Sequence, residues 1–509
     1  MTAIPARADA LRALAESPFD LLVVGGGIVG AGVARDAAMR GFKTALVEQH
    51  DFASGTSSRS SRLLHGGLRY LAQGRIGLVR EASLEKRVIH EIAPHLAQPL
   101  PFLFPAYHGN RHWVLWQLKL GVKLYDALCG GRNFGASTWL SRSEALQEIP
   151  GLAQAGLEGA VRYHDGFTND SRLTLDTLRS AARAGATLAN YCRFHQAASG
   201  GRWECDLEDQ LESRMLQVRA RAIVNAAGPW ADGLPHSRVK LRLTKGIHLV
   251  LDRVRFPVPE AVVMTAGKRI LFAIPWGDRV ILGTTDTDYP GPLEQISIQA
   301  QDIAAVLEVA NRFFPQAGLV ESDALSSWAG VRPLIANPNG NPSEISRSHD
   351  IRNPEPGWWD VAGGKLTTYR LMAEQTLDRI VNSGQLGRRG RACQTAKEPL
   401  LPPNETAGVS GILPPSLTRQ VVEHYCAREW AIHLDDVMLR RSGWHHYLDN
   451  AETAARQVAD WMGESLGWPA AARDAELARY WKVTGGARAP RNLSGSDRPR
   501  KGDSFDFDQ

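Results

Sequence analysis

The sequence predicts an α/β protein in three parts, and three observations support that prediction. An apolar run at 20–24, a helical segment rich in small residues at 28–40 and a second apolar run at 44–47 form one strand–helix–strand unit. Residues 239–290 alternate apolar and polar side chains between turn signals, which predicts antiparallel strands. Residues 416–467 carry a helical pattern throughout. We therefore expect a Rossmann-like domain, an antiparallel-sheet domain and a C-terminal helical domain.

Further elements are expected between these landmarks. A short surface helix is predicted at 6–17. A loop rich in Ser and Gly at 51–70 is predicted to bind a ligand, because His65, Arg69 and Tyr70 interrupt its small residues. The other expected elements are helices at 76–93, 113–128, 171–184, 300–314 and 366–382 and strands near 187–195 and 214–225.

Two boundaries are predicted in the last quarter of the chain. Pro402 and Pro403, followed closely by Gly408 and Gly411, are typical of a domain boundary. From Gly485 onward the chain is polar and its charges are segregated, which predicts a disordered tail.

The composition is that of a globular protein. The chain has 509 residues, 43% of them apolar and 22% charged, which excludes a mostly disordered, collagen-like or polytopic membrane protein. The formal net charge of +5 suits an anionic substrate or an anionic membrane surface. This charge is too small to indicate a nucleic-acid-binding protein, so no nucleic-acid partner is expected.

Neither a metal site nor a membrane-spanning segment is expected. The five cysteines are widely spaced and form no C-x-x-C pair, which argues against a disulfide framework, an iron–sulfur cluster or a zinc site and favours a reducing compartment. No apolar run reaches about 18 residues. The first residues lack the apolar core of a signal peptide. Any membrane contact is therefore expected to be peripheral.

A dinucleotide fingerprint lies at the start of the second predicted helix. Gly25, Gly27 and Gly30 form G-x-G-x-x-G directly after the first strand, where the motif permits a tight turn, close approach to a pyrophosphate and close helix–strand packing. The helix N-terminus offers amide groups to the phosphates. Glu48, at the end of the second strand, can accept hydrogen bonds from ribose hydroxyls. The fingerprint alone does not distinguish NAD from FAD.

Two features favour FAD. The motif lies at the extreme N-terminus of the chain, and a second glycine-rich segment, residues 362–368 (AGGKLTT), opens a helix and can cap the far end of an extended dinucleotide. Residues 225–230 (NAAGPW) also follow an apolar strand and can pack against the adenine end. The sequence therefore predicts FAD rather than a nicotinamide cofactor.

At this point the chain resembles a known family. The segments that carry the resemblance lie in order between about residues 18 and 384 and read GGGIVGAGVARDAAMRG, TSSRSSRLLHGGLRYL, NAAGPW, KGIHLV, IPWGDRVILGTTDTDY, GVRPL and GGKLTTYR. Together they are similar to the FAD-dependent glycerol-3-phosphate dehydrogenases of the respiratory, quinone-linked type. A weaker similarity at 427–442 resembles the C-terminal helical cap of that family.

The resemblance implies how the domains divide. An FAD-binding domain of the glutathione-reductase type is expected to be interleaved with an antiparallel-sheet substrate domain within residues 1–400. The expected ranges are mainly 18–95, 150–235 and 325–385 for the FAD domain, mainly 96–149 and 236–324 for the substrate domain, 401–484 for the C-terminal helical domain and 485–509 for the tail.

The resemblance also implies an activity and its partners. The expected reaction is oxidation of sn-glycerol 3-phosphate to dihydroxyacetone phosphate by hydride transfer to FAD, with electrons passed to a membrane quinone. The implied location is peripheral, at the cytoplasmic face of the inner membrane, and a homodimer is possible. The alternatives are an oxygen-using glycerophosphate oxidase, a related FAD-dependent amine or amino-acid oxidase, and a non-catalytic flavoprotein that binds a polyol phosphate.

Hydride transfer from a secondary alcohol needs an anchored substrate and a base for the hydroxyl proton. A phosphate monoester calls for Arg, Lys or paired donors, and the candidates for substrate binding are Arg69, Tyr70, His248, Arg332 and Lys365. Pro333 biases the backbone of Arg332 toward an extended conformation, which helps to direct its side chain. We assign Arg332 and Lys365 to both substrate binding and catalysis.

His248 is the candidate base, although a lone His in an apolar strand is more often a core residue. The resemblance places it beside the substrate, and the ordinary imidazole pKa of about 6.5 suits a base near neutrality. His65 is assigned to the neighbourhood of the isoalloxazine ring. The full set of predicted FAD contacts is Gly25, Gly27, Gly30, Glu48, Thr56, Ser57, Ser58, His65, Gly66, Gly228, Gly364, Lys365, Leu366 and Thr367.

The segment at 113–128 has two interpretations. Trp113 and Trp116 contribute apolar area, while Lys119 and Lys123 lie one helical turn apart, a combination that suits a helix in a lipid headgroup layer. The other interpretation is an ordinary surface helix packed on the core.

Overall fold

The computed structural model describes residues 7–71, 74–110, 112–130, 133–267, 269–336 and 349–485, without the side chain of Arg69. The predicted tail therefore lies outside the described residues, except for Gly485. The side chain of Arg69, one of the predicted substrate ligands, lies outside them as well.

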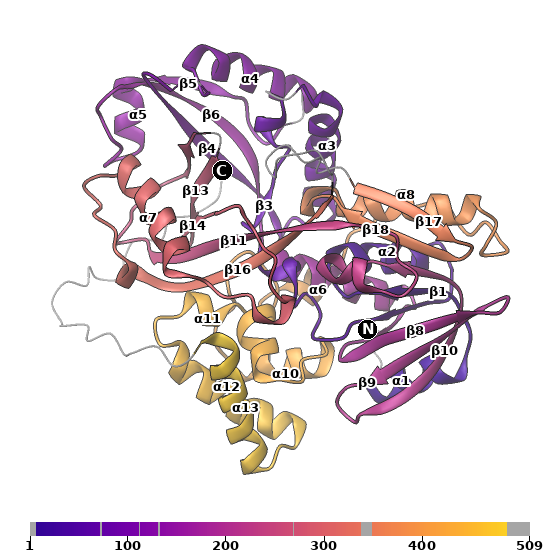
Figure 1. Ribbon diagram of the computed structural model, residues 1–509. Coiled ribbons are helices and arrows are strands. Elements are labelled where there is room, and N and C mark those ends of the chain that lie inside the picture. The colour runs from indigo at the N-terminus through magenta and orange to yellow at the C-terminus, as the bar shows by residue number, and fades with distance from the viewer. Residues whose placement is uncertain are drawn as a thin grey trace.

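The first sheet has a parallel core built on the predicted strand–helix–strand unit, and its main path has the order β17-β18-β10-β1-β2-β7 (Figure 1). An antiparallel pair, β8 and β9, extends it from β10. The strands are β1 (Phe19–Val24), β2 (Thr44–Val47), β7 (Thr187–Ala189), β8 (Cys192–Ser199), β9 (Trp203–Asp209), β10 (Arg214–Asn225), β17 (His349–Glu355) and β18 (Trp358–Gly363).

Helix α2 (Ile28–Met39) packs tightly on this sheet because its contact face is made of small residues. Ala31, Ala34 and Ala38 are buried, as the sequence predicts. Helices α6 (Asp170–Arg183) and α8 (Tyr369–Asn382) pack against α2. The short helix α1 (Arg7–Glu16) lies beside β7 and β10. These contacts fix the start of α2, where the dinucleotide fingerprint lies.

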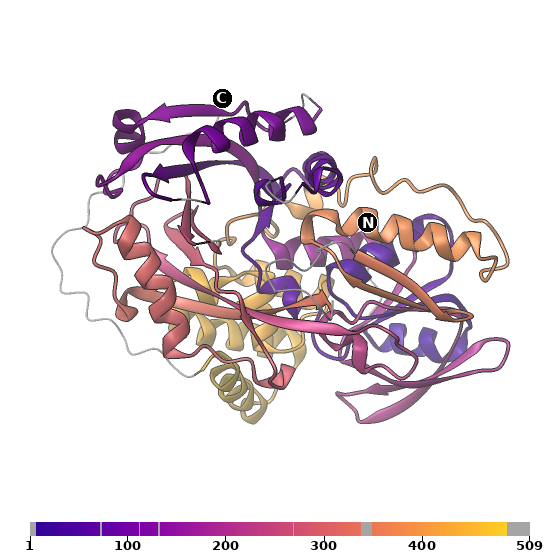
Figure 2. The same cartoon turned by 45° about the horizontal axis from the view of Figure 1, so that its top comes forward.

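The second sheet is mainly antiparallel, with the order β15-β11-β14-β13-β12-β4-β6-β3, and β16 and β5 pair with β11 and β6. The second sheet lies to the left of the first sheet in Figure 1, and the two sheets have the same left-to-right order in Figure 2. Its strands are β3 (Leu63–Leu64), β4 (Ala97–Tyr107), β5 (Thr138–Ser141), β6 (Leu157–Thr168), β11 (Leu241–Asp252), β12 (Ala261–Ala266), β13 (Arg269–Trp276), β14 (Arg279–Gly283), β15 (Thr287–Asp288) and β16 (Ala324–Ile335).

Four helices cover parts of the second sheet. Helix α7 packs on β11 and β12, α4 packs on β6, and α3 lies against both α4 and β4. Helix α5 contacts β5 and β6. Their bounds are α3 (Ile76–Ile92), α4 (Leu115–Leu128), α5 (Arg142–Glu148) and α7 (Ala300–Phe313).

Three long strands of the second sheet were not predicted. In β4, Pro99, Pro101 and Pro105 argue against a strand, because proline donates no hydrogen bond to a ladder. All three stand at odd positions, so the missing donors fall on the same side of the strand.

Strands β6 and β16 lie in ranges that were predicted to belong mainly to the FAD domain, yet both pair within the second sheet.

The C-terminal helices form a separate apolar cluster, which lies at the bottom of Figure 1 below the second sheet. The predicted helical stretch at 416–467 contains three α-helices and a π-helical turn, and a further helix follows it. The bounds are α9 (Pro403–Thr406), α10 (Arg419–Arg428), the π-helix Asp436–Arg441, α11 (Trp444–Tyr447), α12 (Ala451–Leu466) and α13 (Ala470–Thr484). This cluster contacts the first sheet's helix α6 through the π-helix.

Candidate functional site

One large cavity of about 740 Å³ lies between the two sheets. Both sheets and the loop at 51–70 contribute to its wall. The predicted site residues on this wall are Gly25, Gly27, Glu48, Thr56, Ser57, His65, Gly228, His248, Arg332, Gly364, Lys365, Leu366 and Thr367. Four others do not line it, namely Gly30, Ser58, Gly66 and Tyr70.

One end of the cavity has the geometry of a dinucleotide cradle. Gly25 has a left-handed backbone (φ +114°), and a Cβ atom there would lie 2.5 Å from the carbonyl oxygen of Ala226. At Gly30 a Cβ atom would lie 1.9 Å from the carbonyl oxygen of Gly25, so Gly30 acts in helix packing behind the cavity wall. Helix α2 begins at Ile28, whose N–H donates to Ser57 Oγ at 2.9 Å. The helix N-terminus therefore faces a hydroxyl-bearing loop.

Glu48 reaches this cradle from the end of β2. Its carboxylate accepts hydrogen bonds from the N–H of Gly26 at 2.7 Å and from the N–H of His50 at 2.9 Å. Burial raises the pKa of the Glu48 carboxyl. These bonds hold an acceptor group at the position where the fingerprint expects a ribose.

The loop at 51–70 joins the two glycine-rich segments. Thr56 Oγ1 donates to the carbonyl of Val331 at 2.7 Å. The N–H of His65 donates to Thr367 Oγ1 at 3.0 Å, which connects the loop to the turn after β18. Gly66 has a packing role, because its N–H donates to Tyr125 Oη at 2.9 Å.

Lys365 and Arg332 bring positive charge to the cavity. The Nζ of Lys365 lies 4.1 Å from the ring centroid of Tyr70, so Tyr70 supports Lys365 and does not itself reach the cavity. From β16, Arg332 donates to Thr284 Oγ1 at 3.0 Å and to Asp286 Oδ1 at 3.2 Å. These bonds fix the direction of the guanidinium, which the sequence predicted only through Pro333.

Sequence reasoning did not single out Thr284 or Asp286. Both line the cavity, directly after β14. The signal was present in the segment GTTDTDY, in which hydroxyl and carboxyl side chains follow an apolar strand. Without the fold, nothing in that segment indicated that its partner was Arg332.

His248 is buried in β11, and it also lies on the cavity wall. Its Nε2 lies 2.8 Å from Ser61 Oγ, and its ring stacks on Trp328 at a centroid distance of 5.2 Å. Within the described residues, its Nδ1 has no hydrogen-bond partner. Burial lowers the pKa of His248 to about 3, and the charges of Arg332 and Arg62 add to this effect. The imidazole is therefore neutral near pH 7, and it binds a proton more weakly than an imidazole with the ordinary pKa of about 6.5.

A second part of the cavity wall is aromatic. Phe102 and Phe104 from β4, Tyr163 from β6 and Phe272 from β13 line it. Leu68 lines it as well and lies against Gly121 of α4. The cavity thus has a polar end at the fingerprint and an apolar region toward α4.

The outer face of α4 is apolar. Trp116, Leu120 and Leu124 are 63%, 64% and 41% exposed and repeat every four residues, so they share one helix face. Trp139 of β5 is also exposed, and the Nζ atoms of Lys119 and Lys123 lie 5.6 Å and 5.5 Å from its ring centroid. We name Trp116, Leu120, Leu124 and Trp139 the α4 surface.

One expected member of this surface is not part of it. The helix begins at Leu115, and Trp113 lies before it, where its Nε1 donates to the carbonyl of Gly267 at 3.1 Å. Trp113 is half-buried and packs on the core beside Phe104.

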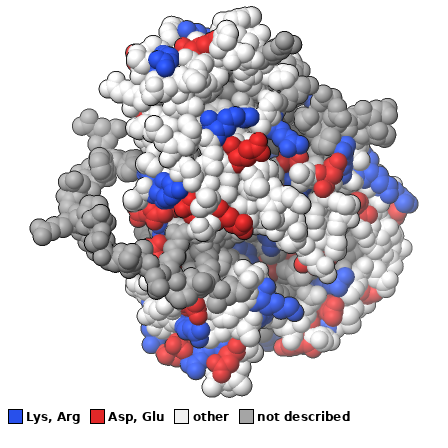
Figure 3. All heavy atoms as spheres, turned by 60° about the vertical axis from the view of Figure 1, so that its left-hand side comes forward, with Lys and Arg blue, Asp and Glu red and all other residues white. Residues whose placement is uncertain are grey.

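Acidic and basic side chains are intermixed on the face of the molecule shown in Figure 3. Broad stretches of this face carry neither. A nucleic-acid-binding face needs a continuous basic surface, and this face has none.

Comparisons with known proteins agree with the architecture and the cradle. Residues 20–376 match the model of a family described as FAD dependent oxidoreductase. A glycerol-3-phosphate dehydrogenase 2 from Mycobacterium bovis is 35% identical, with 93% of this chain and 89% of that protein covered. An aerobic glycerol-3-phosphate dehydrogenase from Staphylococcus saprophyticus is 38% identical over 72% of this chain and 68% of that protein.

A solved structure is similar over nearly the whole chain. It is the glycerol-3-phosphate dehydrogenase from Bacillus halodurans complexed with FAD, which superposes with a TM-score of 0.76 at 27% identity. The match covers 98% of this chain and 100% of that one. The similarity therefore includes the C-terminal helices as well as the two sheets.

Proposed function

This chain belongs to the FAD-dependent oxidoreductases, among the glycerol-3-phosphate dehydrogenases, and from that premise we propose that it oxidises sn-glycerol 3-phosphate to dihydroxyacetone phosphate. The observation that carries the proposal is the convergence of His248, Arg332 and Lys365 on the cavity that also holds the dinucleotide cradle. A base, an anion site and a flavin site are the three parts that this oxidation requires.

The residues of the cradle fit FAD. At Gly25 and Gly30 a Cβ atom would meet backbone carbonyl oxygens, so these two glycines allow the tight turn and the close packing of the helix, while Gly27 on the cavity wall lets the backbone approach a pyrophosphate. We propose that Gly27, Thr56 and Ser57 hold the pyrophosphate and that Glu48 holds the ribose of the adenosine half. His65 and the segment from Gly364 to Thr367 would hold the flavin half. When FAD is bound, its isoalloxazine ring supplies the hydride acceptor.

The substrate phosphate is assigned to Arg332 and Lys365. A guanidinium presents paired donors that match the oxygens of a phosphate, and the bonds to Thr284 and Asp286 hold it in one orientation before substrate arrives. The ammonium of Lys365 adds a second positive charge on the same wall. Together they fix the position of the carbon that is oxidised.

His248 is assigned the hydroxyl proton. As the hydrogen leaves the carbon as hydride with the electron pair of their bond, the oxygen–hydrogen bond breaks and its proton passes to the neutral imidazole. The electron pair of the oxygen–hydrogen bond then completes the carbonyl group. The lowered pKa of His248 keeps the imidazole unprotonated before the reaction, and it also makes this imidazole a weaker base than one with the ordinary pKa of about 6.5. Ser61, at 2.8 Å from Nε2, orients the ring toward the cavity.

Anaerobic titration with glycerol 3-phosphate tests this function. The yellow absorbance of the purified FAD-loaded protein should bleach on addition of glycerol 3-phosphate and should persist with glycerol, glycine or proline. Bleaching by an amine or an amino acid alone would instead indicate the related oxidase chemistry. No bleaching by any of them would indicate a flavoprotein that only binds its ligand.

Ser61→Ala is expected to lower kcat/KM by about three- to tenfold, the effect of one net hydrogen bond in the transition state. The FAD content should not change, because the cradle contacts are untouched. Ser61→Thr keeps the hydroxyl and should restore most of the rate. Equal rates for wild type and Ser61→Ala would show that Trp328 alone orients His248.

We propose that electrons leave to a membrane quinone and that the α4 surface meets the bilayer. Within the described residues no helix is long and apolar enough to cross a membrane, so the contact would be made at the surface. The exposed Trp116 and Trp139 suit the headgroup level, and Lys119 and Lys123 suit anionic lipids. The apolar region of the cavity wall lies on this side of the molecule, which supports a lipid-soluble acceptor.

Lys119→Glu with Lys123→Glu is expected to weaken binding to anionic liposomes by about 30-fold or more, since each Lys near such a surface contributes roughly 1 kcal/mol and each new Glu is repelled by it. Turnover with a liposome-borne quinone should slow, while turnover with a soluble dye should stay the same. Lys240→Glu with Lys397→Glu is the matched control, because it makes the same charge change at two exposed lysines elsewhere.

Undiminished liposome binding by the α4 double variant would contradict this contact. Because Lys123 Nζ also donates to the carbonyl of Ser137, the thermal stability of the double variant should be measured alongside.

The electron acceptor has its own test. Peroxide formation in air, at a rate equal to substrate oxidation, would favour oxygen as the acceptor over quinone.

A further inference from the structure

The C-terminal helical domain contacts the segment at 48–52 on the side that faces away from the cradle. Asp51 is almost fully buried, and Arg441 Nη2 donates to its Oδ1 at 2.8 Å. Arg440 Nε and Arg441 Nη1 both contact Oδ2 of the same carboxylate. Asn190 Nδ2 completes the set at 3.2 Å from Oδ1. The carboxylate of Asp51, beside the cradle, thus accepts hydrogen bonds from two arginines of the π-helix.

The front of the same segment forms the adenosine end of the cradle. Glu48 accepts hydrogen bonds from Gly26 and His50, and the N–H of Ala53 donates to the carbonyl of Gly26 at 3.1 Å. At Gly26 a Cβ atom would lie 2.6 Å from Cδ1 of Phe52. The segment therefore determines the position both of the ribose acceptor and of the glycine turn.

An apolar contact also joins the C-terminal domain to the segment at 48–52. Phe52, which packs on Gly26, meets Trp430 edge to face at a centroid distance of 5.3 Å. Trp430 lies just before the π-helix, and its carbonyl accepts a hydrogen bond from Asn190 at 2.9 Å. A polar and an apolar contact thus both run from the C-terminal domain through residues 51 and 52 to the cradle.

We infer that the C-terminal helical domain completes the FAD site, with Arg440, Arg441 and Trp430 as positioning residues for Glu48 and Gly26. They act through Asp51 and Phe52 and do not touch the cofactor. The inference rests on the proposed FAD cradle, and it assigns to the C-terminal domain the positioning of that cradle. Preorganisation of the segment before FAD arrives is the physical source of the affinity, because ordering it on binding would cost free energy.

The electrostatics of the cluster support this arrangement. Burial alone would raise the pKa of Asp51, yet the charges of Arg441 and Arg440 hold that pKa below its ordinary value. Arg440 also donates to Asp435 at 2.7 Å and to Asp436 at 2.6 Å. Loss of the Asp51 charge leaves Arg441 buried beside a neutral side chain, which is unfavourable. The segment would then lose the contact that holds it.

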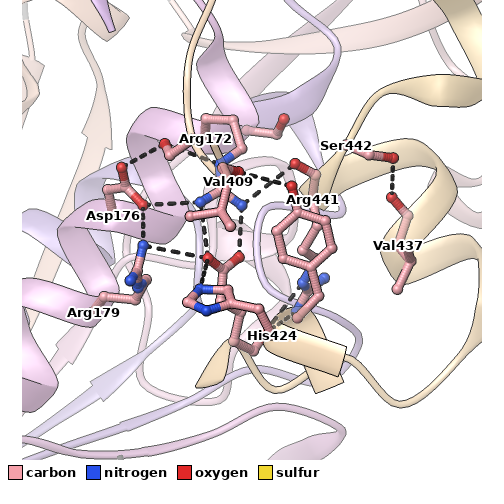
Figure 4. Close-up of polar contacts among 12 residues, drawn as sticks. Arg172, Asp176, Arg179, Val409, His424, Val437, Arg441 and Ser442 are labelled. Carbon is pink, nitrogen blue, oxygen red and sulfur yellow. Dashed lines mark hydrogen bonds and ion pairs between the residues drawn. The ribbon is translucent and has the colours of Figure 1, made fainter. Parts of the chain in front are cut away.

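The same interface contains a second ion cluster that provides a matched control (Figure 4). Arg172 of α6 donates to Glu429 at 2.6 Å and 2.9 Å, and it also pairs with Asp176 at 3.1 Å. Arg179 lies 3.3 Å from the same Glu429 carboxylate. Within the described part of the chain, the hydrogen bonds and ion pairs of the Glu429 carboxylate go to Arg172, Arg179 and His424 and not to the segment at 48–52. Glu429→Gln removes the carboxylate charge from this cluster but keeps the carbonyl of Glu429, which accepts a hydrogen bond from Arg441 at 2.7 Å.

The experiment compares Asp51→Asn with Glu429→Gln in the full-length protein. Each is stripped of FAD, and its dissociation constant for FAD is measured by quenching of flavin fluorescence, together with the thermal stability of the apoprotein. Asp51→Asn is expected to raise the dissociation constant about tenfold or more. Glu429→Gln should lower the stability but change FAD affinity less than about twofold.

At saturating FAD, Asp51→Asn should keep kcat close to the wild-type value, because His248 and Arg332 are untouched. Equal FAD affinity for Asp51→Asn and wild type would overturn the inference. So would equal losses of affinity in Asp51→Asn and Glu429→Gln. If Asp51→Asn does not fold, Arg440→Lys is the second variant, which keeps the charge and removes the Nε donor that reaches Asp51. FAD binding is measured without substrate, so failure of the proposed oxidation would leave this result unaffected.

Discussion

Replacing Arg332 with alanine is expected to lower kcat/KM for glycerol 3-phosphate by about 30- to 5,000-fold, which corresponds to about 2–5 kcal/mol for a charged partner removed from a desolvated phosphate. Arg332 lies on the cavity wall, fixed by Thr284 and Asp286. FAD content should remain at the wild-type level, because the described hydrogen bonds of Arg332 go to residues 284–286 and not to the glycine cradle. Steady-state kinetics and flavin absorbance of the purified variant measure the two quantities.

Two further variants make the test specific. Arg332→Lys keeps the charge but loses the paired donors, and it should recover only part of the rate. Arg242→Ala removes an arginine from the neighbouring strand that pairs with Asp288 outside the cavity, and its kinetics should match wild type. A wild-type kcat/KM in Arg332→Ala would place the phosphate site elsewhere on the cavity wall.

Replacing His248 with asparagine is expected to lower kcat by about 10²–10⁴-fold, the usual contribution of a positioned general base. Asparagine is polar and of similar size, so the packing on Trp328 should survive. Anaerobic stopped-flow measurement of flavin reduction isolates this step from later electron transfer. A rate of reduction within twofold of wild type would show that another group takes the proton.

The pH dependence follows from the lowered pKa of His248. Because burial holds that pKa at about 3, the imidazole stays neutral through the ordinary value of 6.5, and flavin reduction should show no inflection there. The unfolded chain binds a proton near pH 6.5 whereas the folded protein does not. Stability contributed by this group is therefore lost as pH falls from 6.5 toward 3. His248→Asn should show a smaller loss of thermal stability over that range.

Local patterns in the sequence predicted the parts of the site that are contiguous. The fingerprint at Gly25, Gly27 and Gly30, the acceptor at Glu48 and the late segment ending at Thr367 all follow apolar strands, and each one lies at or directly behind the cavity wall. A glycine turn after a strand is recognisable because its backbone requirement is local. The alternation at 239–290 likewise predicted the antiparallel strands that carry His248.

Partners within the site were not predictable in the same way. Ser61 meets His248 across 187 positions of the chain, and Asp286 meets Arg332 across 46. A serine in a loop rich in serine, or an aspartate after a strand, carries no local signal of its partner. Sheet pairing between β11 and β16 brings Arg332 to the cavity, and β16 itself was not predicted.

The sequence by itself determined the fold class, the cofactor class and the family, because each depends on short motifs whose residues lie next to one another. Only the tertiary structure decided how these motifs are held in place. Arg441 contacts Asp51 from 390 residues away, and no periodicity or spacing connects two such positions. Buried contacts between distant segments fix the conformation of the cradle. Those contacts exist only once both sheets and the C-terminal helices have packed.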